Sequence, residues 1–354
     1  MPIERFAENP LLCPADIEPS RDGFEVIGTF NAGAFRLGDR YGLLVRVAER
    51  PVNDDPALVP VPAFDTRSYP PTATSETLRR DDTLWDFSTC VVSPAKNNPV
   101  QHCRLTNLSH LRIAWSTDGR RFILDRSSGS TIWPDNQFER FGIEDARVTQ
   151  IGGAYCITYS AVSDRGICVG LLSTTDFRLF ARHGIILPHE NKDACVFPEK
   201  IDDEYVMLHR PSSGWCRPGM WIARSHDLTH WGRHEFVAAP RPGRWDSRRI
   251  GAGPPPVRTK DGWLEIYHGA GDDGYGLGAV LLDTDNPARV IARSREPVML
   301  PETDYERHGF VDNVVFCNGL IQENDAELRL YYGGADTVTA GAACIVRDLL
   351  DSLE

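Results

Sequence analysis

Short runs in which apolar and polar residues alternate recur along the chain, and each run follows a turn that contains Gly or Asp. Such alternation is typical of a β-strand with one buried face. No amphipathic helical pattern longer than a turn or two competes with it. Five copies of the turn and strand are recognisable, at residues 38–47, 152–161, 202–211, 261–270 and, less cleanly, 325–334. The pattern therefore predicts an all-β chain built from repeats.

A second motif, a small or hydroxyl residue followed by x-Asp-x-x-x-aromatic, repeats in phase with these strands. It spans residues 116–122, 174–180 and 225–231, with a weaker fourth copy near residue 285. The spacings between successive aspartates are 58, 51 and 58 residues, for Asp118, Asp176, Asp227 and Asp285. That period suits one four-stranded blade. With five strand copies, we predict a single five-bladed β-propeller domain over residues 1–354.

Two segments fall outside the repeat. Residues 51–101 are rich in Pro, Asp, Thr and Asn, which predicts a loop-rich insertion in the first blade that forms one wall of a cleft. The strand expected at 342–351 is placed to pair with the N-terminal segment and close the ring of sheets.

Composition narrows the functional classes. The net charge of −12 argues against a nucleic-acid or anionic-membrane partner, since either would be repelled. No apolar run reaches the roughly 18 residues that a membrane span needs, and the first residues lack the apolar core of a secretion signal, so we expect a cytoplasmic protein. The nine cysteines are scattered and odd in number, which indicates reduced core residues. No metal-ligand spacing stands out, and no cofactor is expected.

Polar residues cluster near the ends of the predicted strands, where a propeller brings equivalent positions of its repeats together. Glu144 and Asp145, with Arg147 close behind, supply the carboxylates that glycoside cleavage uses. The alternative is a solvated turn with a local ion pair. Lys192, Arg210, Arg249 and His268 form a candidate anion-binding set. The alternative for these cations is a structural network with the acids Asp145, Asp193, Glu199 and Asp246.

At these clusters the chain resembles glycoside hydrolase family 130, the mannoside phosphorylases and β-mannosidases. The resemblance runs from about residue 31 to residue 339, and several separated motifs carry it in the same order. They lie at residues 30–33, 143–149, 191–201, 209–211, 245–254, 267–269 and 331–336. It implies a five-bladed propeller that cleaves non-reducing-end β-mannosides with inversion of configuration.

The resemblance also implies roles for individual residues. Asp145 matches the family's general acid, which is thought to protonate the leaving oxygen through a mannose hydroxyl. The phosphate-binding positions fall on Lys192, Arg210, Arg249 and either Tyr267 or His268. Sugar-contacting positions fall on Asn31, Arg46 and Asp336, with Glu144 and Arg147 beside the acid.

The chain departs from the commonest phosphorylase pattern at two places. It has Asn191-Lys192-Asp193 where Asn-Arg-Asn is usual, and Arg249 where Lys is usual. Lys lacks the planar fork of Arg, and Asp193 would place negative charge beside phosphate. We therefore expect hydrolysis, with Glu199, Asp193 or Asp246 activating water. The alternatives are phosphorolysis with inorganic phosphate as co-substrate and a non-catalytic carbohydrate-binding propeller. Linkage, acceptor sugar and a homo-oligomeric state are left open.

Overall fold

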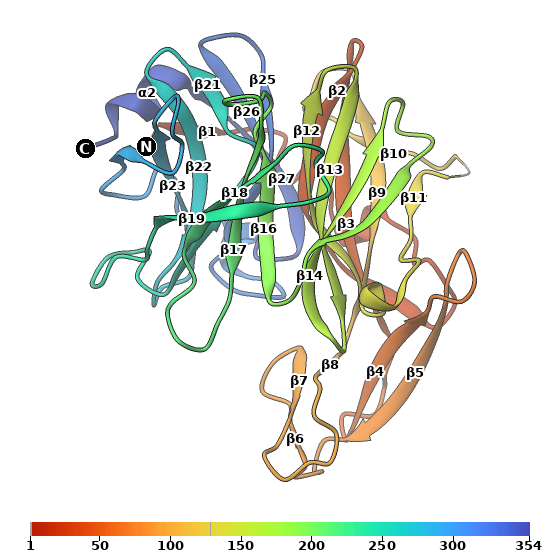
Figure 1. Cartoon of the computed structure of the whole chain (residues 1–354). Helices are drawn as coiled ribbons and strands as arrows, with labels where there is room; N and C mark the ends of the chain where they lie inside the picture. The colour runs from red at the N-terminus through yellow and green to blue at the C-terminus, as the bar shows by residue number, and fades with distance from the viewer. Residues whose placement is uncertain (1, 128) are drawn as a thin grey trace.

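The computed structural model describes residues 2–127 and 129–354, and strands dominate it (Figure 1). The protein is all-β, as the alternating pattern predicts. Each of the five predicted strand repeats forms the second strand of an antiparallel meander. These second strands are β3 (Arg40–Pro51), β13 (Ala154–Ser163), β17 (Tyr205–Pro211), β22 (Gly262–Ala270) and β26 (Glu327–Gly334).

The first two meanders share one nine-stranded sheet. A single parallel pairing between Gly142 and Ser109 joins them. Besides β3, the first contains β2 (Phe24–Leu37), β9 (Leu108–Ser116), β10 (Ile123–Leu124) and β11 (Thr131–Ile132). Besides β13, the second contains β12 (Gly142–Ile151), β14 (Gly166–Thr174) and β15 (Ala181–Leu187).

The other three meanders are separate sheets. The third adds β16 (Asn191–Val196), β18 (Met220–Ser225) and β19 (Gly232–Ala238) to β17. The fourth adds β20 (Arg249–Ala252), β21 (Val257–Thr259), β23 (Tyr275–Leu282) and β24 (Val290–Arg293) to β22. The fifth adds β25 (Val315–Gln322), β27 (Val338–Ile345) and the N-terminal β1 (Ile3–Arg5) to β26.

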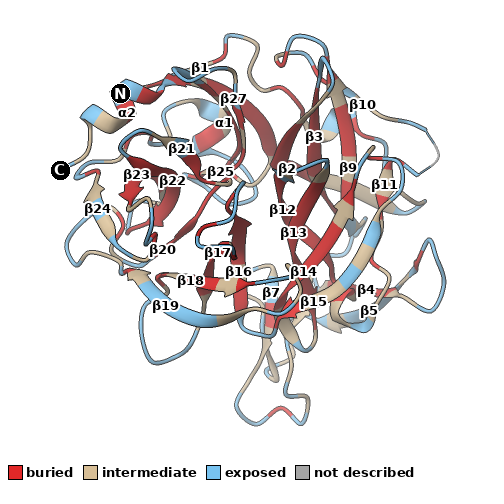
Figure 2. Cartoon of the chain, turned by 45° about the horizontal axis from the view of Figure 1, so that its top comes forward, coloured by how far each residue is buried: buried red, intermediate tan, exposed pale blue. Residues whose placement is uncertain are grey.

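Apolar side chains fill the space between successive meanders. Five large clusters occupy these interfaces, and each draws its strand residues mainly from two neighbouring meanders. The cluster that contains Leu43 and Tyr331 joins the fifth meander back to the first. Figure 2 shows the consequence, since the central strands are buried while outer strands such as β19 are exposed along much of their length. Each meander therefore packs against another meander on both of its faces, and the fifth packs against the first.

The Asp motif forms the turn after the third strand of a meander. Asp118, Asp176 and Asp227 each accept hydrogen bonds from two backbone N–H groups further along the turn. In the fourth meander this position belongs to Asp283, which accepts from the N–H groups of Asp285 and Asn286. The alignment of Asp285 with the motif was therefore wrong by two residues.

The segment expected to be loop-rich, residues 51–101, carries several short strands between its loops. It forms a hairpin of β4 (Leu58–Asp65) and β5 (Thr72–Arg79). It also contributes β6 (Trp85–Asp86) and β7 (Val91–Pro94), which pair in series with β8 (Arg104–Leu105). In Figure 1 both small sheets project below the rest of the molecule. A small apolar cluster around Val59, Val61 and Val92 holds them together.

The chain ends meet in the fifth meander. As expected, the N-terminal segment pairs with the C-terminal strand, because β1 lies antiparallel to β27 with Ile3 opposite Cys344. Residues 346–351, expected to continue the strand, instead form helix α2 (Val346–Asp351). The other helical segments are single turns, at Pro14–Asp16, Gln137–Glu139 and Asp304–Arg307.

In the part of the chain that the structure describes, none of the helices has the length and apolarity to cross a bilayer. All nine cysteines are free thiols, and five of them are buried.

Candidate functional site

The first strands of four meanders carry a β-bulge, and these bulges bring polar side chains together. The bulges lie between Phe30 and Gly33, Glu144 and Arg147, Lys192 and Cys195, and Cys317 and Gly319. A bulge adds an unpaired residue and redirects its side chain. The residues redirected in this way are Asn31, Asp145, Asp193 and Asn318. The first three adopt left-handed φ angles of 50°, 53° and 53°, a conformation that Asn and Asp tolerate better than most residues.

The fourth meander has a glycine at the corresponding place in β20. A Cβ atom on Gly251 would lie 2.3 Å from Asp193 Oδ2 and 2.6 Å from His268 Nε2. Only glycine therefore lets the third and fourth meanders bring Asp193 and His268 together.

Asp145 is the centre of the first group of side chains, which we name the acid cluster. Asn31 Nδ2 and Arg46 Nη1 both donate to its Oδ1 at 3.0 Å. The Oδ2 atom accepts no hydrogen bond from the described residues. Arg46 Nη2 also donates to Glu144 Oε1 at 2.7 Å, and Ser109 Oγ donates to the same oxygen at 3.0 Å. The bulge of β12 is thus held by side chains from β2, β3 and β9.

Asp336 lies in the turn between β26 and β27, with a φ of 48°, and its charge acts on the acid cluster. Burial, together with the charges of Asp145 and Glu144, raises its pKa to about 6 against the opposing effect of Arg46. Burial would also raise the pKa of Asp145, but Arg46, Lys192, Arg147 and the bond from Asn31 hold it below its usual value. In the free protein, Asp336 is therefore protonated before Asp145 as the pH falls.

The second group, which we name the cation cluster, surrounds Asp193. Arg210 Nε lies 2.8 Å and His268 Nε2 3.2 Å from Asp193 Oδ2, and Arg147 Nη2 lies 3.3 Å from Oδ1. Burial alone would raise the pKa of Asp193, but these neighbours keep it well below its usual range. Burial lowers the pKa of His268 to about 4, so its ring is neutral near pH 7. Asp193 is thus a fixed counter-charge among cations and a weak base.

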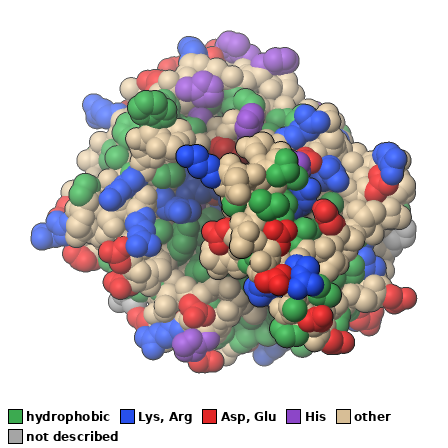
Figure 3. Space-filling view, turned by 90° about the horizontal axis from the view of Figure 1, so that it is seen from below, with side chains coloured by type: hydrophobic (Ala, Val, Ile, Leu, Met, Phe, Trp, Pro, Cys, Tyr) green, Lys and Arg blue, Asp and Glu red, His purple; other side chains and the backbone are tan. Residues whose placement is uncertain are grey.

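Arg147 and Asn318 connect the two clusters. Arg147 Nη2 donates to Asn318 Oδ1 at 3.2 Å, and Asn318 Nδ2 donates to the backbone oxygen of Asn31 at 3.2 Å. Lys192 is close enough to act on the pKa of both Asp145 and Asp336. Arg249 is exposed at the start of β20, two residues before Gly251. The face that carries the insertion is hollowed, and lysine and arginine side chains gather around the hollow (Figure 3).

Buried polar atoms without a hydrogen-bond partner gather at these clusters within the described residues. Among them are Asn31 Oδ1, Arg147 Nε, Ser160 Oγ, Arg210 Nη1 and His268 Nδ1. A buried donor or acceptor that makes no hydrogen bond costs about 1–3 kcal/mol of stability. Both donors and acceptors are among them, so a ligand rich in hydroxyl and anionic oxygen atoms suits the site.

Three residues proposed from the sequence are not brought to this site. Glu199 lies beyond the far end of β16, with its side chain 58% exposed and 3.8 Å from Arg258. Asp246 is fully buried and accepts hydrogen bonds from Arg241, Arg293 and Tyr267. Tyr267 is turned to the opposite face of β22 from His268, because successive side chains alternate along a strand. Neither Glu199 nor Asp246 is placed to activate water at Asp145.

Because Asp246 serves this network, we expect Asp246→Ala to affect folding more than chemistry. Removing it leaves two arginines without their buried counter-charge, which should lower the free energy of unfolding by about 3–5 kcal/mol. Denaturant unfolding measures this loss, and turnover per folded molecule should stay close to that of the parent. If the unfolding curve stayed unchanged while turnover was lost, Asp246 would instead have a direct role in the reaction.

The sequence interpretation missed Asn318, Ser109, Tyr275 and Phe316. The rings of Tyr275 and Phe316 lie 6.3 and 4.1 Å from that of His268. No local motif marks these two aromatic residues. Asn318 had a detectable signal, because the bulged positions form a short repeat of Asn, Asp or Gly followed by Ala or Gly. It begins at residues 31, 145, 193, 251 and 318.

In the described parts of the chain, no three His, Cys, Asp or Glu side chains are grouped so that they could hold a metal ion.

Comparisons with known proteins place this site in a family. An acid beside a set of cations in an all-β fold suits an enzyme that cleaves glycosides. A family model described as beta-1,4-mannooligosaccharide phosphorylase matches residues 102–354. The chain belongs to this family, glycoside hydrolase family 130. It is 43% identical to the Beta-1,2-mannobiose phosphorylase of Listeria innocua, over 100% of this chain and 99% of that protein.

Two further likenesses agree. The 1,2-beta-oligomannan phosphorylase of a Thermoanaerobacter species is 42% identical over 68% of this chain and 80% of its own length. The solved structure of the Listeria innocua Beta-1,2-Mannobiose phosphorylase in complex with beta-1,2-mannobiose matches with a TM-score of 0.94 and 42% identity, over 99% of each chain.

These relatives correct the expectation of hydrolysis. They are named phosphorylases, so the reading that put water in place of phosphate was wrong. The structure supplies the physical reason. Asp193 was expected to repel phosphate or to act as a base, yet its charge is offset by Arg147 and Arg210. The departure at residues 191–193 therefore does not remove the positive character of the site.

Proposed function

We propose that this protein is a β-1,2-mannoside phosphorylase, which converts a β-1,2-linked mannobiose or oligomannoside and inorganic phosphate into α-mannose 1-phosphate and the shortened mannoside. The observation that carries the proposal is the pair of adjoining clusters, an acid cluster around Asp145 and a cation cluster around Asp193. The 43% identity to a Beta-1,2-mannobiose phosphorylase over the whole chain supports the choice of linkage.

We infer that the five meanders are the blades of a five-bladed propeller. The interfaces between successive meanders and the pairing of β1 with β27 support this. In such a ring the first strand of each blade lines the axis, so the bulged positions of β2, β12, β16 and β25 point at one small volume. The propeller thereby accounts for the meeting of residues as distant in sequence as Asn31 and Asn318.

In this proposal Asp145 is the general acid. Its Oδ1 is held by Asn31 and Arg46, so Oδ2 carries the proton that passes to the leaving oxygen, directly or through a mannose hydroxyl. Asp145 is ionised in the free protein, because the surrounding cations hold its pKa down. A phosphate dianion bound beside Lys192 offsets that charge and raises the pKa of Asp145. Phosphate binding therefore favours the protonated form of Asp145, which is the form that acts as the acid.

The cation cluster binds phosphate. Arg210 has a buried Nη1 without a partner among the described residues, and the neutral His268 ring leaves Nδ1 for a phosphate O–H. Lys192 and the exposed Arg249 add positive charge on the same side. Asp193 keeps the guanidinium of Arg210 and the ring of His268 in place, which makes it a positioning residue.

The mannosyl unit lies against the acid cluster, where Asn31, Arg46, Glu144 and Asp336 offer hydrogen-bonding groups to its hydroxyls. A phosphate oxygen attacks C1 on the face opposite the leaving oxygen, so the C1–O bond breaks as the new bond forms and the configuration inverts. Asp145 gives its proton to the leaving oxygen. The proton of hydrogen phosphate then restores Asp145, so the reaction neither takes up nor releases protons overall.

Product analysis tests the proposal. The purified protein is incubated with β-1,2-mannobiose, with and without inorganic phosphate, and β-1,4-mannobiose serves as the linkage control. We expect mannose 1-phosphate and mannose in equal amounts, only when phosphate is present and mainly from the β-1,2 substrate. Free mannose released without phosphate would contradict the proposed reaction, and faster cleavage of the β-1,4 substrate would contradict the proposed linkage.

A further inference from the structure

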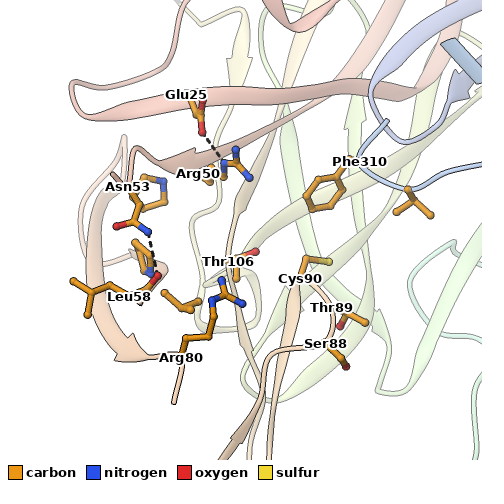
Figure 4. A pocket seen from close by; sticks show the side chains of 14 residues that line it. Glu25, Arg50, Asn53, Leu58, Arg80, Ser88, Thr89, Cys90, Thr106 and Phe310 are labelled. Carbon is orange, nitrogen blue, oxygen red and sulfur yellow. Dashed lines mark hydrogen bonds and ion pairs between the residues drawn. The ribbon is translucent and has the colours of Figure 1, made fainter. Parts of the chain in front are cut away.

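A cavity of about 540 Å³ lies between the insertion and the fifth meander (Figure 4). Its walls come from three parts of the chain that are distant in sequence. The end of β3 contributes Arg50, the insertion and the residues just after it contribute Arg80, Cys90 and Thr106, and the segment before β25 contributes Phe310 and Val311. This volume lies within the range of about 300–1,000 Å³ that is usual for sites that bind small molecules.

The cavity adjoins the acid cluster on two sides. The backbone N–H of Phe310 donates to Thr337 Oγ1 at 2.8 Å, and that of Val311 donates to the backbone oxygen of Ala335 at 3.1 Å. These two bonds flank Asp336, so the apolar wall of the cavity is fixed to the turn that carries this carboxylate. On the other wall, Cys90 lies near enough to Arg46, Glu144 and Asp336 for their charges to act on its thiol.

The stereochemistry of the proposed reaction places the leaving sugar on the side of the site where the cavity lies. Inversion requires phosphate and the leaving group on opposite faces of C1. Phosphate belongs beside Arg210 and His268 in the third and fourth meanders, so the leaving sugar departs away from them. The acid cluster, formed by the first, second and fifth meanders, stands on that far side, and the cavity lies next to it.

The lining also has the chemistry of a sugar site. Phe310 and Val311 are 36% and 39% exposed. Covering such apolar surface with a ligand is favourable, because burial removes it from water. An aromatic ring suits the apolar face of a pyranose. Arg80 stands at the opposite wall, where its Nε donates to the backbone oxygen of Pro56 at 3.1 Å and so fixes the guanidinium. In Figure 4 these two side chains approach the cavity from different elements, with Cys90 and Thr106 between them.

We propose that this cavity binds the leaving sugar and the mannose units that follow it, with Phe310 as the stacking platform and Arg80 as a hydrogen-bond donor to hydroxyls. This assignment rests on the proposed phosphorylase function and adds the residues that select the acceptor. The insertion at residues 51–101 then determines which acceptors and chain lengths the enzyme accepts.

The reverse reaction tests the assignment, because it separates the two sugars. Mannose 1-phosphate is the donor, and mannose or β-1,2-mannobiose is the acceptor. Losing the aromatic contact in Phe310→Ala should raise the acceptor KM about five- to tenfold. The KM for mannose 1-phosphate should stay within about twofold of the parent, because that sugar sits in the acid cluster. Arg80→Ala, a change at the opposite wall, should show the same split.

Phe236→Ala is the matched control, since Phe236 is an exposed aromatic residue on β19, outside the cavity. Its two KM values should equal those of the parent. Equal increases in both KM values in Phe310→Ala, or no increase in either, would overturn the assignment. A parent protein that forms no mannose 1-phosphate from any β-mannoside would instead overturn the proposed function, so the two failures are distinguishable.

Discussion

Asp145→Asn should reduce the turnover of β-1,2-mannobiose by about 10³-fold or more, because the amide cannot protonate the leaving oxygen. The substitution keeps the shape of the side chain, and the amide oxygen can still accept from Asn31 Nδ2 and Arg46 Nη1. The fold and sugar binding should therefore survive. Release of mannose 1-phosphate measures the first effect, and calorimetric titration with mannobiose measures the second.

A leaving group that needs no proton separates an acid from a residue that only shapes the site. With an aryl β-mannoside whose phenolate is stable, Asp145→Asn should lose far less activity than it does with mannobiose. Equal losses on both substrates would mean that Asp145 acts through positioning, and more than a tenth of the parent turnover on mannobiose would exclude it as the acid.

The repeat pattern predicted much of the fold, because alternation is a local property of a strand with one buried face. All five predicted strand runs are second strands of meanders. The short strands inside the insertion could not be predicted in the same way. Residues 58–65 contain Pro60 and Pro62, and the facing strand, residues 72–79, is mostly exposed and has no buried face. A two-stranded ribbon tolerates proline at positions whose N–H would point outward.

The site was only partly predictable. Asp145, Asp193, Arg210 and His268 could be named from their places near strand ends, since a ring of repeats brings such positions together. The environment of each could not be inferred in the same way. Asp246 is a charged residue in the same kind of polar motif, but its partner Arg293 lies 47 residues further along the chain. Whether an acid joins the clusters around Asp145 and Asp193 or a separate buried network depends on such long-range contacts.

The role of Asp193 shows how contacts that the sequence does not reveal changed the inference about the reaction. From the sequence alone, an aspartate beside Lys192 subtracts charge from a phosphate site. In the structure it sits among Arg147, Arg210 and His268 and holds two of the candidate phosphate ligands in place. The bulge at residues 192–195 turns Asp193 toward these cations, and a strand without the bulge would present different side chains.

Arg210→Ala should lower kcat/KM for phosphate by about 10²- to 10³-fold, because it removes a guanidinium and weakens the pairing of a buried carboxylate. Asp193 would retain Arg147 and His268, so the cluster should stay folded while losing a main anion-binding group. Arg210→Lys should recover part of the loss, since an ammonium keeps the charge without the planar fork. Initial rates at varied phosphate and fixed mannobiose measure both effects.

Binding of phosphate to the folded state gives a second readout that does not depend on turnover. A ligand that binds only the native protein raises its melting temperature. Phosphate should therefore stabilise the parent and the control Arg347→Ala, whose side chain is exposed on α2 and paired with Asp351, but should stabilise Arg210→Ala much less. If phosphate shifted the melting temperature of Arg210→Ala as far as that of the parent, the anion would have to bind elsewhere. Phosphate would then not be held by the cation cluster, and the proposed attack on C1 from that side would be wrong.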